Sequence, residues 1–127
     1  MARLRLTAFV SDVKVGANAS PGAVTTAGAA LPALDGVLLS HNHYDHLDER
    51  TVRQLGARGL PFVVPTGVQA LLTGWGIPAT QVREVSWWEA VEFGGVHVTA
   101  TPSRHFSGRS PLMNDRDRSL WCGYAFT

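Results

Sequence analysis

The sequence predicts an α/β fold in which helices pack outside a sheet. Between residues 36 and 85, short apolar runs typical of buried strands alternate with segments that carry helix caps and end near Gly or Pro. After residue 85, two β-type runs flank a pair of glycines, which is typical of a β-hairpin. The chain has 127 residues without an internal repeat or an evident boundary, and we interpret residues 1–127 as a single domain.

The first 40 residues contain two expected strands. Residues 1–10 alternate apolar and polar side chains, which indicates a strand. Residues 17–35 are rich in Ala, Gly, Thr, Ser and Pro and show no period, so we expect a loop there. The apolar run 36–40 is short and continuous, which favours a strand buried on both faces.

A helix is expected shortly after this buried strand. Asp48 can cap a helix that begins at Glu49, because a carboxylate at that position accepts a hydrogen bond from a free backbone N–H group. Val52 and Leu55 would face the core from this helix. Two glycines that follow Leu55 are expected to end it.

The middle of the chain repeats the strand–helix–strand order. Residues 61–64 predict a buried strand. Thr66 and Gln69 have the spacing of a capping box, which predicts a second helix that extends through Trp75. Residues 81–85 are expected to form the next strand.

The last third of the chain is expected to be mostly β-structure. Residues 91–93 and 96–101 predict the two arms of the hairpin. The aromatic-rich segment 119–126 predicts a final strand. Charges of alternating sign at 115–118 are interpreted as a solvated turn.

Composition excludes several classes of protein. Hydrophobic residues make up 45% of the chain and charged residues 17%, which indicates a folded domain. No apolar run approaches the roughly 20 residues of a membrane-spanning helix. A net charge of +1 without a basic stripe gives no reason to expect a nucleic-acid partner. The one cysteine, Cys122, cannot form an internal disulfide, so we expect a cytoplasmic protein; peripheral membrane association and the oligomeric state stay open.

The segment 40–48 carries the strongest chemical signal, a His-x-His-x-Asp-His pattern directly after the buried strand. Chemistry in layered α/β folds gathers on such loops. His41 and His43 are two residues apart, so they point the same way from an extended loop and can bind one metal ion. Asp45 and His46 can face a second ion. Imidazole and carboxylate ligands suit zinc, iron or manganese.

A third ligand for the first metal is expected at His105, which also follows a predicted strand. A catalytic zinc ion commonly keeps three protein ligands and one open position for water. The remaining histidine, His97, alternates with two valines and is interpreted as a residue without a role. A purely structural interpretation of the 41–46 cluster is disfavoured, because the sequence offers no partners for several imidazoles on one loop.

The His-x-His-x-Asp-His motif resembles the signature of the metallo-β-lactamase superfamily. The longer stretches 39–48, 102–109 and 115–123 are similar to one branch of it, which contains the phospholipase D that hydrolyses N-acyl-phosphatidylethanolamine and its bacterial relatives. Ascorbate-phosphate lactonases are more distant members. The resemblance extends from about residue 34 to the end of the chain.

This resemblance implies a four-layer αβ/βα sandwich with two divalent metal ions at one edge, of which the chain would supply mainly the N-terminal half. It implies that His41, His43 and His105 hold the first ion and that Asp45 and His46 hold the second. Zinc is the expected metal, with iron or manganese as alternatives. The bridging Asp and the final His of the family have no counterpart in these residues, so we expect 1–127 to be an incomplete metallo-β-lactamase-fold domain.

The expected activity is zinc-dependent hydrolysis of a phosphodiester, in a small-molecule or phospholipid-like substrate. Two metal ions about 3.5–4 Å apart lower the pKa of a shared water toward ~7 and supply hydroxide at neutral pH. Asp45 is expected to orient this nucleophile as well as to bind metal. Arg109 is expected to pair with a substrate phosphate through its planar guanidinium, with a structural role as the equal alternative.

Four alternatives stay open. A lactonase or another hydrolase of this fold would use the same ligands. A di-iron oxygenase or sulfur dioxygenase would hold iron instead of zinc. A nuclease of the superfamily is disfavoured by the net charge of +1. An inactive, truncated remnant would keep the His-rich loop without the second half of the site.

Overall fold

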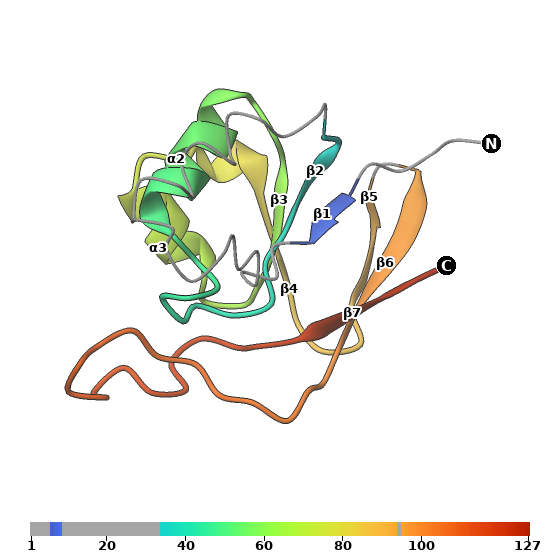
Figure 1. The fold of residues 1–127 in the computed structure, drawn as a ribbon. Coiled ribbons are helices and arrows are strands. Elements are labelled where there is room, and N and C mark those ends of the chain that lie inside the picture. Colours follow the sequence, from blue (N-terminus) through green and yellow to red (C-terminus); the bar gives the residue numbers. More distant parts are fainter. Residues whose placement is uncertain (1–5, 9–33, 94) are drawn as a thin grey trace, which may run out of the picture.

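The computed structural model describes the backbone of residues 6–8 and the whole of residues 34–93 and 95–127. Within these ranges the chain forms two sheets and two α-helices, in the arrangement of Figure 1. The parallel sheet has the order β1 (Leu6–Ala8), β2 (Gly36–Leu38), β3 (Phe62–Pro65) and β4 (Val82–Val85). The antiparallel sheet has the order β5 (Ala90–Phe93), β6 (Val96–Thr101) and β7 (Gly123–Phe126). The predicted α/β fold is confirmed.

The parallel sheet is the central layer of this arrangement. Helices α2 (Glu49–Ala57) and α3 (Gln69–Gly74) lie on one side of it and the β5–β7 sheet on the other (Figure 1). The short 3₁₀ helix η1 (Ala79–Gln81) leads into β4. No helix among the described residues has the length and apolar character that a bilayer crossing requires.

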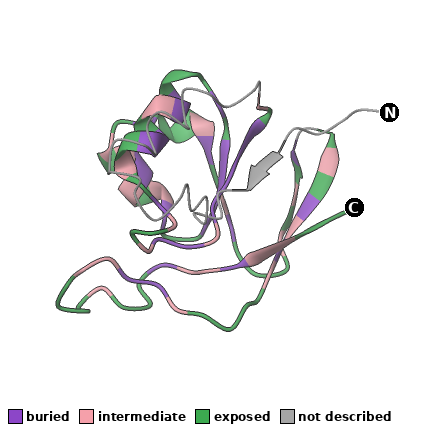
Figure 2. Ribbon diagram, in the orientation of Figure 1, coloured by how far each residue is buried: buried purple, intermediate pink, exposed green. Residues whose placement is uncertain are grey.

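Successive residues of the central strands face two different cores. Val37 and Phe62 pack with the helices, whereas Leu38 and Val63 pack with the antiparallel sheet. All four side chains are buried, as Figure 2 shows for β2 and β3 along their length. Alternation across a strand therefore fills both interfaces, and the predicted burial of 36–40 and 61–64 on both faces is confirmed for the strands themselves.

Helix α2 begins where the sequence predicts. The Asp48 carboxylate accepts hydrogen bonds from the Thr51 N–H at 2.8 Å and from the Thr51 hydroxyl at 2.7 Å. Val52 and Leu55 are buried against the parallel sheet. The helix ends at Ala57, one residue after the first of the two glycines that were expected to end it. Because cap and apolar face are both local in sequence, this helix was predictable.

The predicted capping box of α3 is wrong. The helix begins at Gln69, and the Thr66 hydroxyl pairs instead with the Ser86 hydroxyl at 2.9 Å. Glu84, on β4, accepts hydrogen bonds from the N–H groups of Gly67 at 2.7 Å and Gln69 at 2.8 Å. A carboxylate from the neighbouring strand therefore satisfies the free amides at the start of α3, which a local motif cannot reveal.

The hairpin is confirmed, and the last strand is shorter than predicted. Phe93 pairs with Val96 in the antiparallel register of β5 and β6. Strand β7 begins only at Gly123, because the N–H groups of Leu120 and Cys122 bond to carbonyls of Thr66 and Ser40 at the ends of β3 and β2. These contacts tie segment 102–122, between β6 and β7, to the edge of the parallel sheet.

The N-terminal predictions are only partly tested. Strand β1 (Leu6–Ala8) lies within the predicted strand 1–10 and pairs in parallel with β2. The other residues of that segment, and residues 17–33 of the predicted loop, lie outside the described residues.

Candidate metal centre

Three imidazoles from two separate loops converge beyond the ends of β2 and β6. His41 and His43 come from the loop after β2, and His105 comes from the segment after β6. The Nε2 atom of His105 lies 3.0 Å from Nε2 of His41 and 3.2 Å from Nδ1 of His43. The ligand atoms of all three lie within 4.8 Å of one another. The structure thus brings together the three residues predicted to hold the first metal.

Two of the three spacings between these nitrogens are close to those around a single metal ion. A tetrahedral zinc ion with Zn–N bonds of about 2.0–2.1 Å holds its ligand nitrogens about 3.3 Å apart. The two closest nitrogen pairs, at 3.0 and 3.2 Å, are near that value. Two N–H groups cannot face each other at such distances, so each pair includes at least one free lone pair. A donor set of this kind suits zinc, iron or manganese.

Burial keeps the two loop imidazoles neutral. It is the largest influence that lowers the pKa of His41 to about 4, followed by repulsion from His46, His105 and His43. Burial also lowers the pKa of His43, followed by repulsion from His105. A neutral imidazole retains the lone pair that binds metal, so both rings are in the ligating form at neutral pH.

The environment of His41 also fixes its orientation. Its Nδ1 atom lies 2.8 Å from the Ser40 hydroxyl, which leaves Nε2 toward His105. The imidazole is almost fully buried, whereas His43 is half-buried and His105 is exposed. The candidate site is therefore closed on the His41 side and open to solvent beside His105.

Asp45 and His46 lie beside the cluster and form a pair of their own. The Asp45 carboxylate is 3.4 Å from Nε2 of His46, and its side chain is 77% exposed. The His46 ring lies 4.3 Å from the His41 ring, measured between centroids. Neither residue belongs to the three-imidazole group, so the prediction that they hold a second metal stays a prediction.

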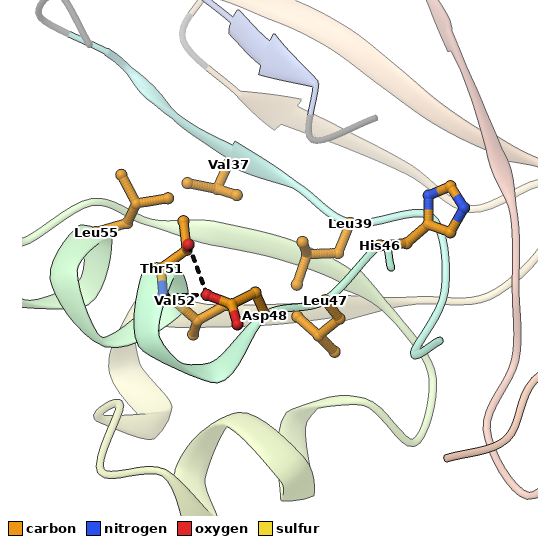
Figure 3. Close-up of a pocket in the computed structure, with 8 residues that line it drawn as sticks. All are labelled: Val37, Leu39, His46, Leu47, Asp48, Thr51, Val52 and Leu55. Atoms are coloured by element: carbon orange, nitrogen blue, oxygen red, sulfur yellow. Dashed lines mark hydrogen bonds between the residues drawn. The ribbon is translucent and has the colours of Figure 1, made fainter. Parts of the chain in front are cut away.

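A compact turn from His43 to Leu47 carries candidate ligands of both metal ions. The His43 carbonyl accepts hydrogen bonds from the N–H groups of His46 at 3.0 Å and Leu47 at 2.8 Å. Leu47 is buried, and together with His46 it lines a cavity of about 10 Å³ between β2 and α2 (Figure 3). Figure 3 shows the His46 ring at the end of this cavity farthest from Leu55. The turn thus directs His43 toward His105 while its far end is anchored in the core.

The segment around His105 is held by buried and half-buried polar contacts. The Asn42 side-chain oxygen accepts the N–H of Gly108 at 2.7 Å. Both carboxylate oxygens of Asp115 accept backbone N–H groups, from Arg109 at 2.7 Å and Ser110 at 2.9 Å. These backbone hydrogen bonds lower the pKa of Asp115.

The turn predicted at 115–118 is present and its residues 116–118 are exposed, but two of its carboxylates also accept backbone hydrogen bonds. Asp115 organises the backbone after Gly108, and Asp117 accepts the Ser107 N–H at 3.2 Å. The missed signal is an Asp that follows a Ser-Gly-Arg-Ser stretch, because Asp side chains commonly accept backbone N–H groups of nearby loop residues.

Arg109 lies against the His-rich loop. Its Nη1 atom donates to the carbonyls of Asn42 at 2.9 Å and Leu47 at 2.7 Å. Burial is the main influence that lowers the pKa of its guanidinium. The predicted contact between Arg109 and a substrate stays a prediction.

The sequence belongs to a known family. Residues 12–127 match the family described as Beta-lactamase superfamily domain, so the chain is a member of that superfamily. The resemblance inferred from the His-x-His-x-Asp-His motif is confirmed.

Two curated relatives are similar over most of the chain. An uncharacterised protein of Mycobacterium tuberculosis is 46% identical over 99 residues, which are 77% of this chain and 26% of the relative. The mitochondrial N-acyl-phosphatidylethanolamine-hydrolysing phospholipase D of Saccharomyces cerevisiae is 38% identical over 102 residues, which are 76% of this chain and 21% of the relative. The chain spans about a quarter of the length of these relatives.

A solved structure supports the fold. CmlA, a di-iron β-hydroxylase from Streptomyces venezuelae, superimposes with a TM-score of 0.59 at 24% sequence identity. The match covers 78% of this chain and 19% of CmlA. The chain therefore has part of the architecture that this enzyme contains.

Proposed function

We propose that the protein is a metal-dependent hydrolase that cleaves phosphodiesters of the N-acyl-phosphatidylethanolamine type. The observation that supports this proposal most strongly is the convergence of three ring nitrogens, from His41, His43 and His105, around one point. The similarity to the yeast phospholipase D supplies the substrate class, a phospholipid.

In this proposal, His41, His43 and His105 hold the first ion, and Asp45 and His46 hold a second. When bound, the metal ions supply an activated water at neutral pH and stabilise the negative charge of the reaction. The exposed Asp45 carboxylate lies in the turn that begins at His43, where it can orient an attacking water and accept its proton. The open side of the cluster, at His105, leaves room for a substrate to approach.

The metal assignment is tested with one ligand variant and one control. The complete gene product is purified without added metal, and zinc, iron and manganese are measured per mole of protein. We expect His43→Ala to lose most of the bound metal and His97→Ala to keep it, because His97 is exposed on β6. Equal metal content in His43→Ala and the wild type contradicts the assignment.

The same measurement separates hydrolysis from oxygenase chemistry. Zinc supports the proposed hydrolase, whereas iron favours the alternative of a di-iron oxygenase, since CmlA is a di-iron β-hydroxylase. An activity assay with three test substrates, a bis-aryl phosphate, a lactone and a cephalosporin, then identifies the type of bond that the protein hydrolyses. We expect turnover of the phosphate diester; turnover of the lactone alone favours the lactonase alternative.

The incomplete domain and the location are parts of the proposal that need their own tests. Reading the gene beyond residue 127 tests the incomplete domain, because an Asp at a strand end and a later His encoded there would complete the second metal site. A stop codon at that point favours the inactive remnant. Cell fractionation tests the expected cytoplasmic location and any peripheral association with membranes.

A further inference from the structure

Two loops that are distant in sequence must keep a fixed position relative to each other for the three imidazoles to meet. His41 and His43 lie on the loop after β2, and His105 lies 62 residues after His43. A displacement of about 1 Å is enough to spoil a metal or catalytic geometry. The contacts between these two loops therefore keep the three imidazoles of the candidate site at the right distances from one another.

The loop after β2 contains the turn described above, from His43 to Leu47. Its internal hydrogen bonds all end on the His43 carbonyl. The Asn42 carbonyl lies just before the turn and the Leu47 carbonyl lies at its end. Neither carbonyl is used by the turn itself, so both are free to accept a donor from another segment.

Arg109 supplies that donor to both carbonyls. Its Nη1 atom lies 2.9 Å from the Asn42 carbonyl and 2.7 Å from the Leu47 carbonyl. A charged donor makes hydrogen bonds about twice as strong as those between neutral groups. One guanidinium nitrogen thus bridges the two ends of the turn that carries His43, Asp45 and His46.

The guanidinium is itself held in place. Its central carbon lies 4.0 Å from the centroid of the Tyr44 ring and 5.1 Å from that of the Trp75 ring, within the range of cation–π contacts. The Arg109 N–H is bonded to Asp115, and the preceding Gly108 N–H is bonded to the Asn42 side chain. Backbone and side chain of 108–109 are therefore both fixed against the His-rich loop.

We propose that Arg109 is a positioning residue for the metal site: its guanidinium joins the Asn42 and Leu47 carbonyls and so holds the 43–47 turn in register with His105. This inference rests on the proposed function, because the site that it positions is the proposed metal site. It also differs from a role in substrate binding. An arginine that contacts only substrate changes KM and leaves metal affinity in the absence of substrate untouched.

Metal affinity without substrate is the first test. The metal-free complete gene product is titrated with Co²⁺, whose visible absorption reports ligand geometry, and with Zn²⁺ in competition. Arg109→Met keeps the aliphatic stem and removes the donors. We expect its metal Kd to rise roughly ten- to a hundredfold, the range for the loss of residues that orient metal ligands, together with an altered Co²⁺ spectrum. Arg104→Met, an exposed arginine on the same segment, is the matched control and should match the wild type.

Arg109→Lys measures rescue. A lysine ammonium group can donate to both carbonyls, but it lacks the planar guanidinium that stacks on the aromatic rings. We therefore expect a metal Kd between those of the wild type and Arg109→Met. A wild-type Kd and spectrum in Arg109→Met overturn the inference. If Arg109→Met does not fold, the lysine variant decides: unchanged metal affinity and an unchanged spectrum in Arg109→Lys overturn it.

Hydrogen exchange in the metal-free protein tests positioning independently of metal. The N–H groups of His46 and Leu47 form the turn, so their exchange should accelerate in Arg109→Met or Arg109→Lys and stay unchanged in Arg104→Met. Unchanged exchange at both amides in the arginine variants contradicts the inference. A wild-type protein that binds no metal contradicts the proposed function instead, while the exchange measurement still decides whether Arg109 holds the turn.

Discussion

The orientation of the most buried ligand candidate depends on a hydroxyl next to it in sequence. The Ser40 hydroxyl lies 2.8 Å from Nδ1 of His41, and the opposite nitrogen of that ring faces His105. Metal-bound imidazoles commonly use their second nitrogen in this way, which fixes the tautomer and the ring plane. At the scale of single residues, the His41 ring is therefore already oriented for the proposed metal by its neighbour in the sequence.

Ser40→Ala tests this preparation. The variant removes the partner of His41 Nδ1 but leaves the Ser40 carbonyl, which accepts the Cys122 N–H, in place. We expect metal affinity to fall roughly tenfold, measured by competition with a chelator. Ser103→Ala, at an exposed position near His105, should have no effect. Equal affinities in Ser40→Ala and the wild type would show that the hydroxyl does not orient the ring.

Gly108 occupies a backbone conformation that other residues rarely adopt. Its φ is 151°, and a Cβ atom there would lie 3.4 Å from the Asp115 carboxylate. We expect Gly108→Ala to lower the free energy of unfolding by about 1–3 kcal/mol, measured by denaturant unfolding. Gly74→Ala is the control, because a Cβ added there meets none of the described residues outside its own helical turn within 4 Å. A variant Gly108→Ala as stable as the wild type contradicts this account of the loop.

At the scale of elements, helix α2 connects the His-rich loop to the core. Its N-cap, Asp48, directly follows the 43–47 turn, and its apolar face packs on β2 and β3. The cap therefore fixes the point at which the loop ends. The cavity lined by His46 and Asp48 in Figure 3 lies at this junction.

Asp48→Ala is expected to destabilise the helix start. The Thr51 N–H and hydroxyl both lose their acceptor, which costs about 0.5–2 kcal/mol of unfolding free energy. Asp48→Asn keeps an oxygen acceptor and should retain most of the stability. Denaturant unfolding of the two variants measures the difference. Equal losses in both would indicate that the negative charge, and not the cap, matters at this position.

The comparison of α2 with α3 shows which elements were predictable from sequence. The cap of α2, Asp48, lies three residues before its partner Thr51, so this helix start was predictable from the local sequence. The amides at the start of α3 bond to Glu84, which lies 15 residues after Gln69 and reaches the helix only because β3 and β4 pair. The shortened β7 has the same cause, since the Cys122 N–H bonds to Ser40, far away in sequence.

In the candidate site too, the residues that form a short motif were predictable, whereas the contacts between segments far apart in the sequence were not. His41, His43, Asp45 and His46 were selected from one short motif, whereas His105 needed the family resemblance as well. The contacts that hold the two loops together, from Asn42 to Gly108 and from Arg109 to the loop carbonyls, left no local pattern in the sequence. Their partners are brought together only by the fold.

At the scale of the whole molecule, two packed sheets each contribute residues to one cluster of imidazoles. The parallel sheet delivers His41 and His43 from the end of β2, and the antiparallel sheet delivers His105 from the end of β6. The apolar core between the sheets, which includes Leu38 and Val98, holds these strand ends side by side. The proposed metal site therefore depends on the packing of the two sheets as well as on the loops.

A crystal structure of the complete gene product grown with zinc tests the central claim most directly. Anomalous scattering at the zinc edge locates the ion without reference to the fold. We predict a peak about 2.0–2.1 Å from one ring nitrogen each of His41, His43 and His105. A protein without a zinc peak at these imidazoles, or with the His105 ring turned away from an ion held by the other two, would contradict the account.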